Sequence, residues 1–103
     1  MMNAEQIILN IAVNLGRLSR FSMEGREERV RQFLADTEKY LNLINKSGID
    51  IRFKPTLEHF KQEFYRLKSK PLDRDFAEDT LTWANILQHR ARLASPAKRA
   101  KLA

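Results

Sequence analysis

Hydrophobic residues recur at intervals of three and four positions in four separate segments of the chain. This spacing places them on one side of an α-helix, which has 3.6 residues per turn. The widest apolar arc lies in residues 76–93, and an arc this wide needs more than one partner helix. Its members are Phe76, Thr80, Trp83, Leu87, Ala91 and Ala94, flanked by Ala77, Leu81, Ala84 and Ile86. We therefore expect this segment to be the centre around which three earlier helices pack.

The three earlier segments each carry a narrower apolar stripe. The predicted helices cover residues 4–21, 25–46 and 56–69. Their stripes are Ala4, Ile7, Ile8, Ile11, Leu15 and Leu18 in the first, Val30, Phe33, Leu34, Thr37, Tyr40, Leu41 and Ile44 in the second, and Leu57, Phe60, Phe64 and Leu67 in the third. Four amphipathic helices joined by short links predict an all-α, antiparallel up-down four-helix bundle. The alternative is a hairpin of the first two helices that completes its core by dimerising.

Single residues mark the expected helix ends. Ser22 can cap the start of the second helix, Gly48 is placed to end it, and Asp73 is the strongest candidate to cap the fourth. Gly16 lies inside the first helix, where glycine costs about 1 kcal/mol relative to alanine. We expect this glycine to permit the close approach of a neighbouring helix.

The link between the second and third helices has a different pattern. Ile49, Ile51 and Phe53 alternate with charged residues, which indicates extended backbone. A single short strand has no partner elsewhere in the chain. We therefore expect a connection that lays these three side chains over the end of the bundle. Pro55 is expected to hold Lys54 outside the third helix.

Length and composition favour one domain over residues 1–95 and a short basic tail over residues 96–103, which we expect to be mobile. The chain has 103 residues, 43% hydrophobic and 31% charged, which is enough for one core. It has no cysteine, which excludes disulfides and thiolate metal sites. The longest apolar run, residues 7–13, is too short to span a bilayer, and no basic signal segment precedes it. We expect a cytoplasmic protein without a membrane partner.

Positive charge is concentrated at one end of the predicted bundle. The formal net charge is +6 and the isoelectric point is near 10.0. In an up-down bundle, one end receives eight cations and only three acidic residues. The cations that we expect to bind nucleic acid or another acidic partner are Arg52, Lys54, Arg90, Arg92, Lys98, Arg99 and Lys101. The helix dipole also favours cations at helix C-termini, which explains Lys46, Arg90 and Arg92 but not the tail.

A second candidate surface lies on the first helix. Leu9 and Val13 are one turn apart and lie away from the apolar stripe, next to a polar ridge. The expected protein interface is Leu9, Val13, Asn10, Asn14 and Arg17. The alternative is that another helix of the same chain buries Leu9 and Val13.

No stretch carries a strong catalytic, metal or nucleotide-binding motif. His59 and His89 lack a second histidine or cysteine three or four positions away, and the glycines are too far apart for a phosphate loop. We expect no cofactor, no metal and no small-molecule substrate. Arg52 precedes His59 by seven positions, and this spacing resembles the arginine–histidine pair of HEPN-type helical ribonucleases. The resemblance implies a dimeric ribonuclease with these two catalytic residues, although Pro55 interrupts a segment that is helical in that family.

These patterns favour a small, non-enzymatic binding or adaptor protein. It would self-associate through the first helix and engage an acidic partner with its basic end. The alternative is a nucleic-acid-binding accessory protein that contacts phosphates with the same basic end and tail. The third hypothesis is the dimeric helical ribonuclease. The identity of the partner does not follow from the sequence.

Overall fold

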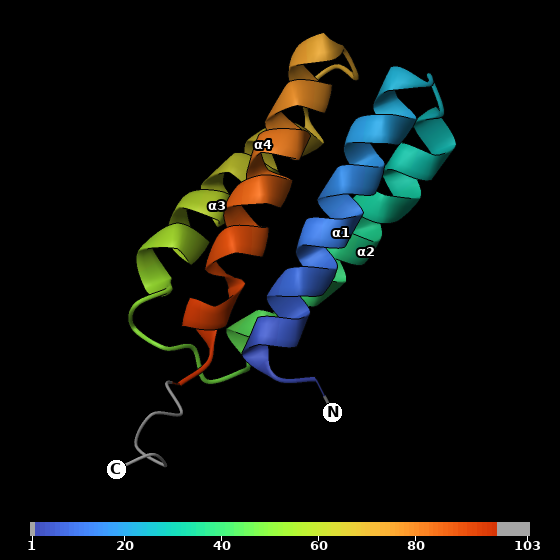
Figure 1. Ribbon diagram of the computed structural model, residues 1–103. Helices are drawn as coiled ribbons and strands as arrows, with labels where there is room; N and C mark the ends of the chain where they lie inside the picture. Colours follow the sequence, from blue (N-terminus) through green and yellow to red (C-terminus); the bar gives the residue numbers. More distant parts are fainter. Residues whose placement is uncertain (1, 97–103) are drawn as a thin grey trace.

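The computed structural model describes residues 2–96, which form four α-helices and a final 3-10 helix (Figure 1). The elements are α1 (Ala4–Met23), α2 (Glu27–Asn45), α3 (Lys54–Lys68), α4 (Arg74–Arg90) and η1 (Ala91–Ala94). No strand occurs in this range. The helices run alternately up and down, which confirms the predicted all-α, antiparallel four-helix bundle.

The central helix of the bundle is α1. It packs closely against α2 on one side and against α4 and η1 on the other. Figure 1 shows α1 and α4 side by side, in front of α2 and α3. Eleven of the 20 residues of α1 are buried, compared with six of the 17 in α4. The expectation that residues 76–93 form the centre is therefore wrong, because the aliphatic stripe of α1 fills both interfaces.

The predicted stripes merge into one hydrophobic core. Trp83 joins α4 to α3, since its ring centroid lies 5.5 Å from that of Phe60 and 4.9 Å from that of His59. All stripe residues of α1 are buried. Leu81 is 50% exposed, which contradicts the expectation that it widens the buried arc of α4. Leu81 lines a surface groove together with Ser19 and Met23 of α1.

The turn between α1 and α2 is closed by backbone groups. The Arg26 amide donates to the Phe21 carbonyl at 2.9 Å, and the Gly25 amide donates to the Ser22 carbonyl at 3.2 Å. Gly25 has a φ of 71°, the left-handed conformation that this helix ending requires. The prediction that Ser22 caps α2 is wrong. Ser22 lies within α1, where its hydroxyl donates to the Ser19 carbonyl, and α2 starts without a side-chain cap.

Two of the α-helices have side-chain N-caps. The Asp73 carboxylate accepts from the Phe76 amide at 3.0 Å, which confirms the predicted cap of α4. Asn3 and Gln6 form a reciprocal capping box at the start of α1, an addition to the prediction. Each satisfied amide removes one of the unpaired donors at a helix start.

The connection from α2 to α3 only partly follows its alternating pattern. Phe53 is fully buried and Ile49 packs against the core, as expected. Ile51 is 78% exposed, which contradicts the expectation for this residue. Residues 51–53 form a turn rather than an extended segment, so the alternation of side chains does not persist.

Gly48 and Pro55 also behave differently from the prediction. α2 ends at Asn45, before Gly48, whose φ is not positive. α3 already begins at Lys54, with Pro55 in its first turn. Proline is tolerated there because the first amides of a helix have no partner within the helix. The prediction that Pro55 holds Lys54 outside the helix is therefore wrong.

Gly16 does not serve a close helix contact within this chain. A Cβ atom built at this position would meet no heavy atom within 4 Å outside its own helix backbone and chain neighbours. The expectation of a neighbouring helix at Gly16 is therefore wrong for the single chain.

Candidate binding surfaces

Ser95 ties together the end of the bundle where α1 begins and η1 ends. Its hydroxyl accepts from the Glu5 amide at 3.0 Å, and its carbonyl accepts from the Arg52 guanidinium at 3.2 Å. Next to it, the Ala94 carbonyl accepts from the Asp50 amide at 3.0 Å. These bonds fix the connection from α2 to α3 against η1 and α1.

The described part of the basic end consists of five cations: Lys46, Arg52, Lys54, Arg90 and Arg92. Arg52 is neutralised within the chain, because its Nε lies 2.9 Å from Asp50 Oδ1. Arg90 donates to the Thr56 hydroxyl at 3.2 Å and retains its charge. Lys98, Arg99 and Lys101 lie outside the described residues.

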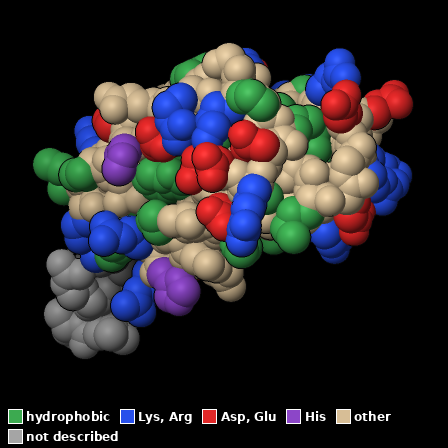
Figure 2. Space-filling model, turned by 90° about the horizontal axis from the view of Figure 1, so that it is seen from above, with side chains coloured by type: hydrophobic (Ala, Val, Ile, Leu, Met, Phe, Trp, Pro, Cys, Tyr) green, Lys and Arg blue, Asp and Glu red, His purple; other side chains and the backbone are tan. Residues whose placement is uncertain are grey.

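Most of these cations lack an acidic partner. Within residues 2–96, no carboxylate lies within 4.0 Å of the charged groups of Lys46, Lys54, Arg90 or Arg92. At the left of Figure 2, Lys and Arg side chains gather with few Asp or Glu among them. Both kinds of charge are interspersed toward the right of the same view. The structure therefore brings together the sequence-predicted basic residues that it describes.

Apolar side chains are also exposed at the basic end. Ile51 is 78% exposed, Leu43 is 43% exposed and Met2 is 37% exposed. Leu43 and Met2 line a groove of about 470 Å³ that also includes Lys46 and Ser95. The sequence-based prediction placed Ile51 over the end of the bundle and gave no role to Leu43, which lies off the predicted stripe of residues 25–46. The basic end is thus a mixed cationic and apolar surface.

The α3–α4 turn, at the opposite end of the bundle, holds its cations in ion pairs. Arg66 Nη2 lies 2.7 Å from Glu63 Oε1 and 3.2 Å from Asp79 Oδ2, and Lys70 Nζ lies 3.1 Å from the same Asp79 oxygen. Lys68 contacts Glu38 at 2.7 Å. These bonds join α3 to α4 and to α2, and they leave few cations there for an external partner.

The ion pairs shift the pKa values of their members. The hydrogen bond from Arg66 lowers the pKa of Glu63, against a smaller opposing effect of burial. For Asp79, burial raises the pKa, but the bonds from Lys70 and Arg66 together outweigh it, so the pKa is lowered. The same two carboxylates raise the pKa of Arg66. Both carboxyl groups therefore favour the charged form in the folded protein.

Only part of the predicted interface on α1 is available to a partner. Asn14 is 3% exposed and donates to Asp36 at 2.9 Å, so its place in the interface is wrong. Arg17 lies 5.4 Å from the ring of Phe33, and Asn10 donates to the carbonyl of Gln6. Asn10, Asn14 and Arg17, the polar side chains of the predicted interface, therefore all make contacts within the chain. Two members of the predicted set remain as exposed apolar side chains: Leu9 at 37% and Val13 at 52%.

Two further apolar residues extend this surface. Met23 of α1 is 77% exposed and Leu81 of α4 is 50% exposed. Leu9, Gly16 and Met23 follow one another at intervals of seven, which is the signal that sequence reasoning missed. We name Leu9, Val13, Gly16, Met23 and Leu81 the outward face.

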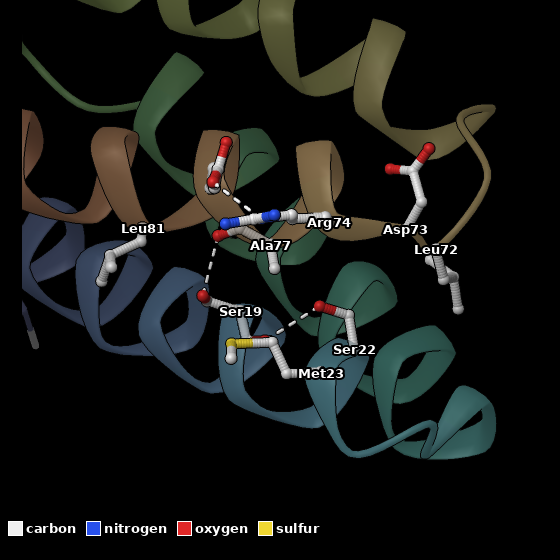
Figure 3. Close-up of a pocket in the computed structure, with 9 residues that line it drawn as sticks. Ser19, Ser22, Met23, Leu72, Asp73, Arg74, Ala77 and Leu81 are labelled. Carbon is white, nitrogen blue, oxygen red and sulfur yellow. Dashed lines mark hydrogen bonds and ion pairs between the residues drawn. The ribbon is translucent and has the colours of Figure 1, made fainter.

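A groove of about 600 Å³ lies at the Met23 end of the outward face (Figure 3). Met23, Leu72, Ala77 and Leu81 provide its apolar lining. The Ser19 hydroxyl donates to the Ala77 carbonyl at 2.7 Å, and the Ser22 hydroxyl is likewise bound within α1. Because both hydroxyls are engaged, the groove mainly offers apolar contact.

The residues of the ribonuclease hypothesis occupy separate environments. His59 lies edge-on to Trp83, whereas Arg52 is bound to Asp50 and Ser95. No hydrogen bond joins Arg52 to His59 in the described chain. Residues 2–96 also contain no group of three His, Cys, Asp or Glu side chains placed to hold a metal ion. No helix among them has both the length and the apolar character to cross a membrane.

Comparison with known proteins finds no matching family model, no matching curated protein and no matching solved structure. The two surfaces themselves, the basic end and the outward face, therefore carry the inference of function.

Proposed function

We propose that this protein is a small, non-enzymatic binding or adaptor protein of the cytoplasm that self-associates through α1 and engages an acidic protein segment with its basic end. The observation that carries the proposal is the lack of carboxylate partners around Lys46, Lys54 and Arg92 within residues 2–96, in contrast to the paired cations of the α3–α4 turn. Cations that are not neutralised within the chain attract and orient an acidic partner.

The exposed apolar residues favour a protein as that partner. Ile51 and Leu43 lie among the cations of the basic end, where an aliphatic side chain of the partner would contact them. Single-stranded nucleic acids instead use aromatic rings on which bases stack. The large exposed side chains at this end are aliphatic or thioether groups.

Nucleic acid is the second candidate partner. The concentration of positive charge supports it, since phosphate contacts need cations rather than a shaped pocket. The contacting residues would be Arg52, Lys54, Arg90, Arg92, Lys98, Arg99 and Lys101. Binding of this kind weakens steeply with salt and depends little on sequence.

A titration with three probes separates the two partners. The probes are an acidic peptide with leucine at every fourth position, a polyglutamate peptide of equal charge, and a random RNA. We expect the leucine-containing peptide to bind most tightly at an ionic strength of about 0.15 M. Tighter binding of RNA, with a steep salt slope, would support the nucleic-acid candidate instead.

Matched charge variants locate the binding surface. Lys46→Ala with Arg92→Ala should weaken peptide binding by at least about tenfold. Arg29→Ala with Lys39→Ala is the control, because it removes the same charge from exposed residues of α2. Equal losses in both double variants would show that net charge acts without a specific site.

The ribonuclease remains a third proposal with its own test. If Arg52 and His59 cleave RNA, the full chain should degrade a random RNA and His59→Ala should abolish that activity without unfolding the protein. Unchanged cleavage in His59→Ala would reject these residues as the catalytic pair.

A further inference from the structure

We propose that a second copy of this chain covers the outward face, with the two α1 helices antiparallel and a two-fold axis beside Gly16 and Leu81. This inference rests on the self-association in the proposed function and names its surface and geometry. It follows from the spacing of the outward face, from Gly16, from the groove at Met23 and from the charges that border both ends.

The exposed positions of α1 have the spacing of a helix–helix contact. Leu9, Val13, Gly16 and Met23 follow at intervals of four, three and seven, as in the seam of a coiled coil. Arg20 occupies the remaining seam position, is exposed and lies 5.0 Å from the ring of Phe21. The seam along α1 is therefore apolar except at Arg20.

Gly16 has no role within the single chain that offsets its cost to the helix. Glycine inside a helix costs about 1 kcal/mol relative to alanine. The space above it is open, since a Cβ would meet nothing within 4 Å. At a two-fold axis, two such glycines would let the backbones of the two α1 helices approach closely.

The two halves of the outward face are complementary in shape. Leu9 and Val13 protrude at one end, and the groove beside Met23 and Leu81 lies at the other. Leu9 and Met23 are each seven residues from Gly16, or about 10 Å along the helix. A two-fold axis at Gly16 places each Leu9 over the partner's groove and the two Leu81 side chains against each other. Such an interface is isologous and closes as a dimer.

The bordering charges are complementary under the same operation. Glu5 and Arg92 line the surface beside Leu9, and Asp73, Arg74 and Glu78 line the groove beside Met23, where Arg74 Nε lies 3.4 Å from Glu78 Oε2. The two-fold operation thus brings Glu5 and Arg92 of one copy to a groove with two anions and one cation in the other. Copies with a net charge of +6 repel one another, and these borders, with three anions and two cations, are where they can meet.

The oligomeric state tests the proposal directly. Sedimentation velocity of the full chain over a concentration series should show a monomer–dimer equilibrium. Gly16→Leu should weaken the dimer by at least about tenfold, because its side chain fills the axis and has open space in the monomer. Ala35→Leu, which likewise introduces a leucine side chain but on the exposed side of α2, should leave the equilibrium unchanged. A monomer at every concentration, or equal dimers in wild type and Gly16→Leu, would overturn the inference.

Crosslinking tests the antiparallel register. The chain has no cysteine, so Leu9→Cys and Met23→Cys each introduce a unique thiol. A mixture of the two variants, treated with a short bifunctional maleimide, should yield mainly the mixed dimer. Crosslinked Leu9→Cys dimers formed as readily as mixed ones would overturn the antiparallel geometry.

Peptide binding separates this inference from the proposed function. The Gly16→Leu monomer should retain binding of the acidic peptide, because Lys46, Lys54 and Arg90 of the basic end lie outside the outward face and Arg92 touches only its border. Loss of dimers with intact peptide binding supports both statements. Intact dimers without peptide binding would reject the basic-end function and leave the dimer standing.

Discussion

The two ends of the bundle differ in what holds their cations. Arg66, Lys68 and Lys70 at the α3–α4 turn each contact a carboxylate. At the basic end Arg52 alone does so among the described cations, and it uses Asp50 from its own connection. The α3–α4 turn pairs its cations internally, whereas the basic end, like Arg20 and Arg29 of the α1–α2 turn, presents most of its described cations to solvent.

The comparison shows that a cation stays free of an internal partner only where the fold supplies no anion beside it. The positive end of the helix dipole stabilises the acidic residues in the first turns of α4. One of them, Asp79, also pairs with two cations. Two helices, α1 and α3, begin at the basic end. The first turn of α3 has no acidic residue, and Glu5 in the first turn of α1 makes no ion pair in the described chain. Two helices begin at each end, so the distribution of acidic residues among their first turns decides which end stays positively charged.

The largest expected effect comes from removing the anchor of the basic end. Phe53→Ala should lower the free energy of unfolding by about 3–5 kcal/mol, because the fully buried ring leaves a cavity. Ile51→Ala, two residues earlier and 78% exposed, should change it by less than about 0.5 kcal/mol. Urea denaturation measures both. Similar losses in the two variants would contradict the placement of the connection.

A smaller effect is expected when the basic end receives the kind of pairing found at the other end. Gln88→Glu places a carboxylate four residues before Arg92, beside it in the same surface groove. Binding of the acidic peptide should fall several-fold. Gln62→Glu is the control, because it adds the same charge four residues before Arg66, which is already paired. A titration in which both variants bind alike would remove the distinction between the ends.

The smallest effect concerns the paired end and its pH dependence. Asp79→Asn should lower the free energy of unfolding by less than about 1 kcal/mol at neutral pH, because the pairs are solvent-screened. The folded-state pKa values of Glu63 and Asp79 lie below their ordinary values. Their contribution is therefore fully present above about pH 4.5 and is lost as the pH falls through the lowered values.

Denaturation of wild type and Asp79→Asn across the acidic range measures this loss. The difference between the two proteins should shrink as the pH falls below the ordinary carboxyl range. Lys54→Gln at the basic end is the control and should show no such dependence. A difference that grows on acidification would contradict the direction of the pKa shifts.

The bundle could be predicted from the sequence because helix periodicity reports which side of a segment is apolar. It does not report which neighbour lies on each side. Leu81 and Asn14 show this: both lie next to a buried stripe, but Leu81 is half exposed, whereas α2 brings Asp36 to Asn14, which is buried. The side that a helix leaves uncovered depends on contacts between segments far apart in the chain.

The candidate surfaces were predictable to different extents. The basic end follows from the up-down topology, so Arg90 and Arg92 could be placed beside Lys54. The exposure of Ile51 could not be predicted. Successive side chains alternate between two faces only in extended backbone, and residues 51–53 form a turn. Met23 was hidden by its position at a helix end, beyond the predicted boundary of α1.

The Ser95 contacts have a consequence for the order of folding. The bond from the Glu5 amide spans 90 residues, and the bond from Arg52 spans 43. Closing such long loops costs more chain entropy than forming the α1–α2 hairpin, so these contacts should form after the rate-limiting step. Substitution of Ser95 by alanine should accordingly speed unfolding and leave the folding rate nearly unchanged, a φ-value near zero. The basic end would then be the last part of the molecule to assemble and the first to open.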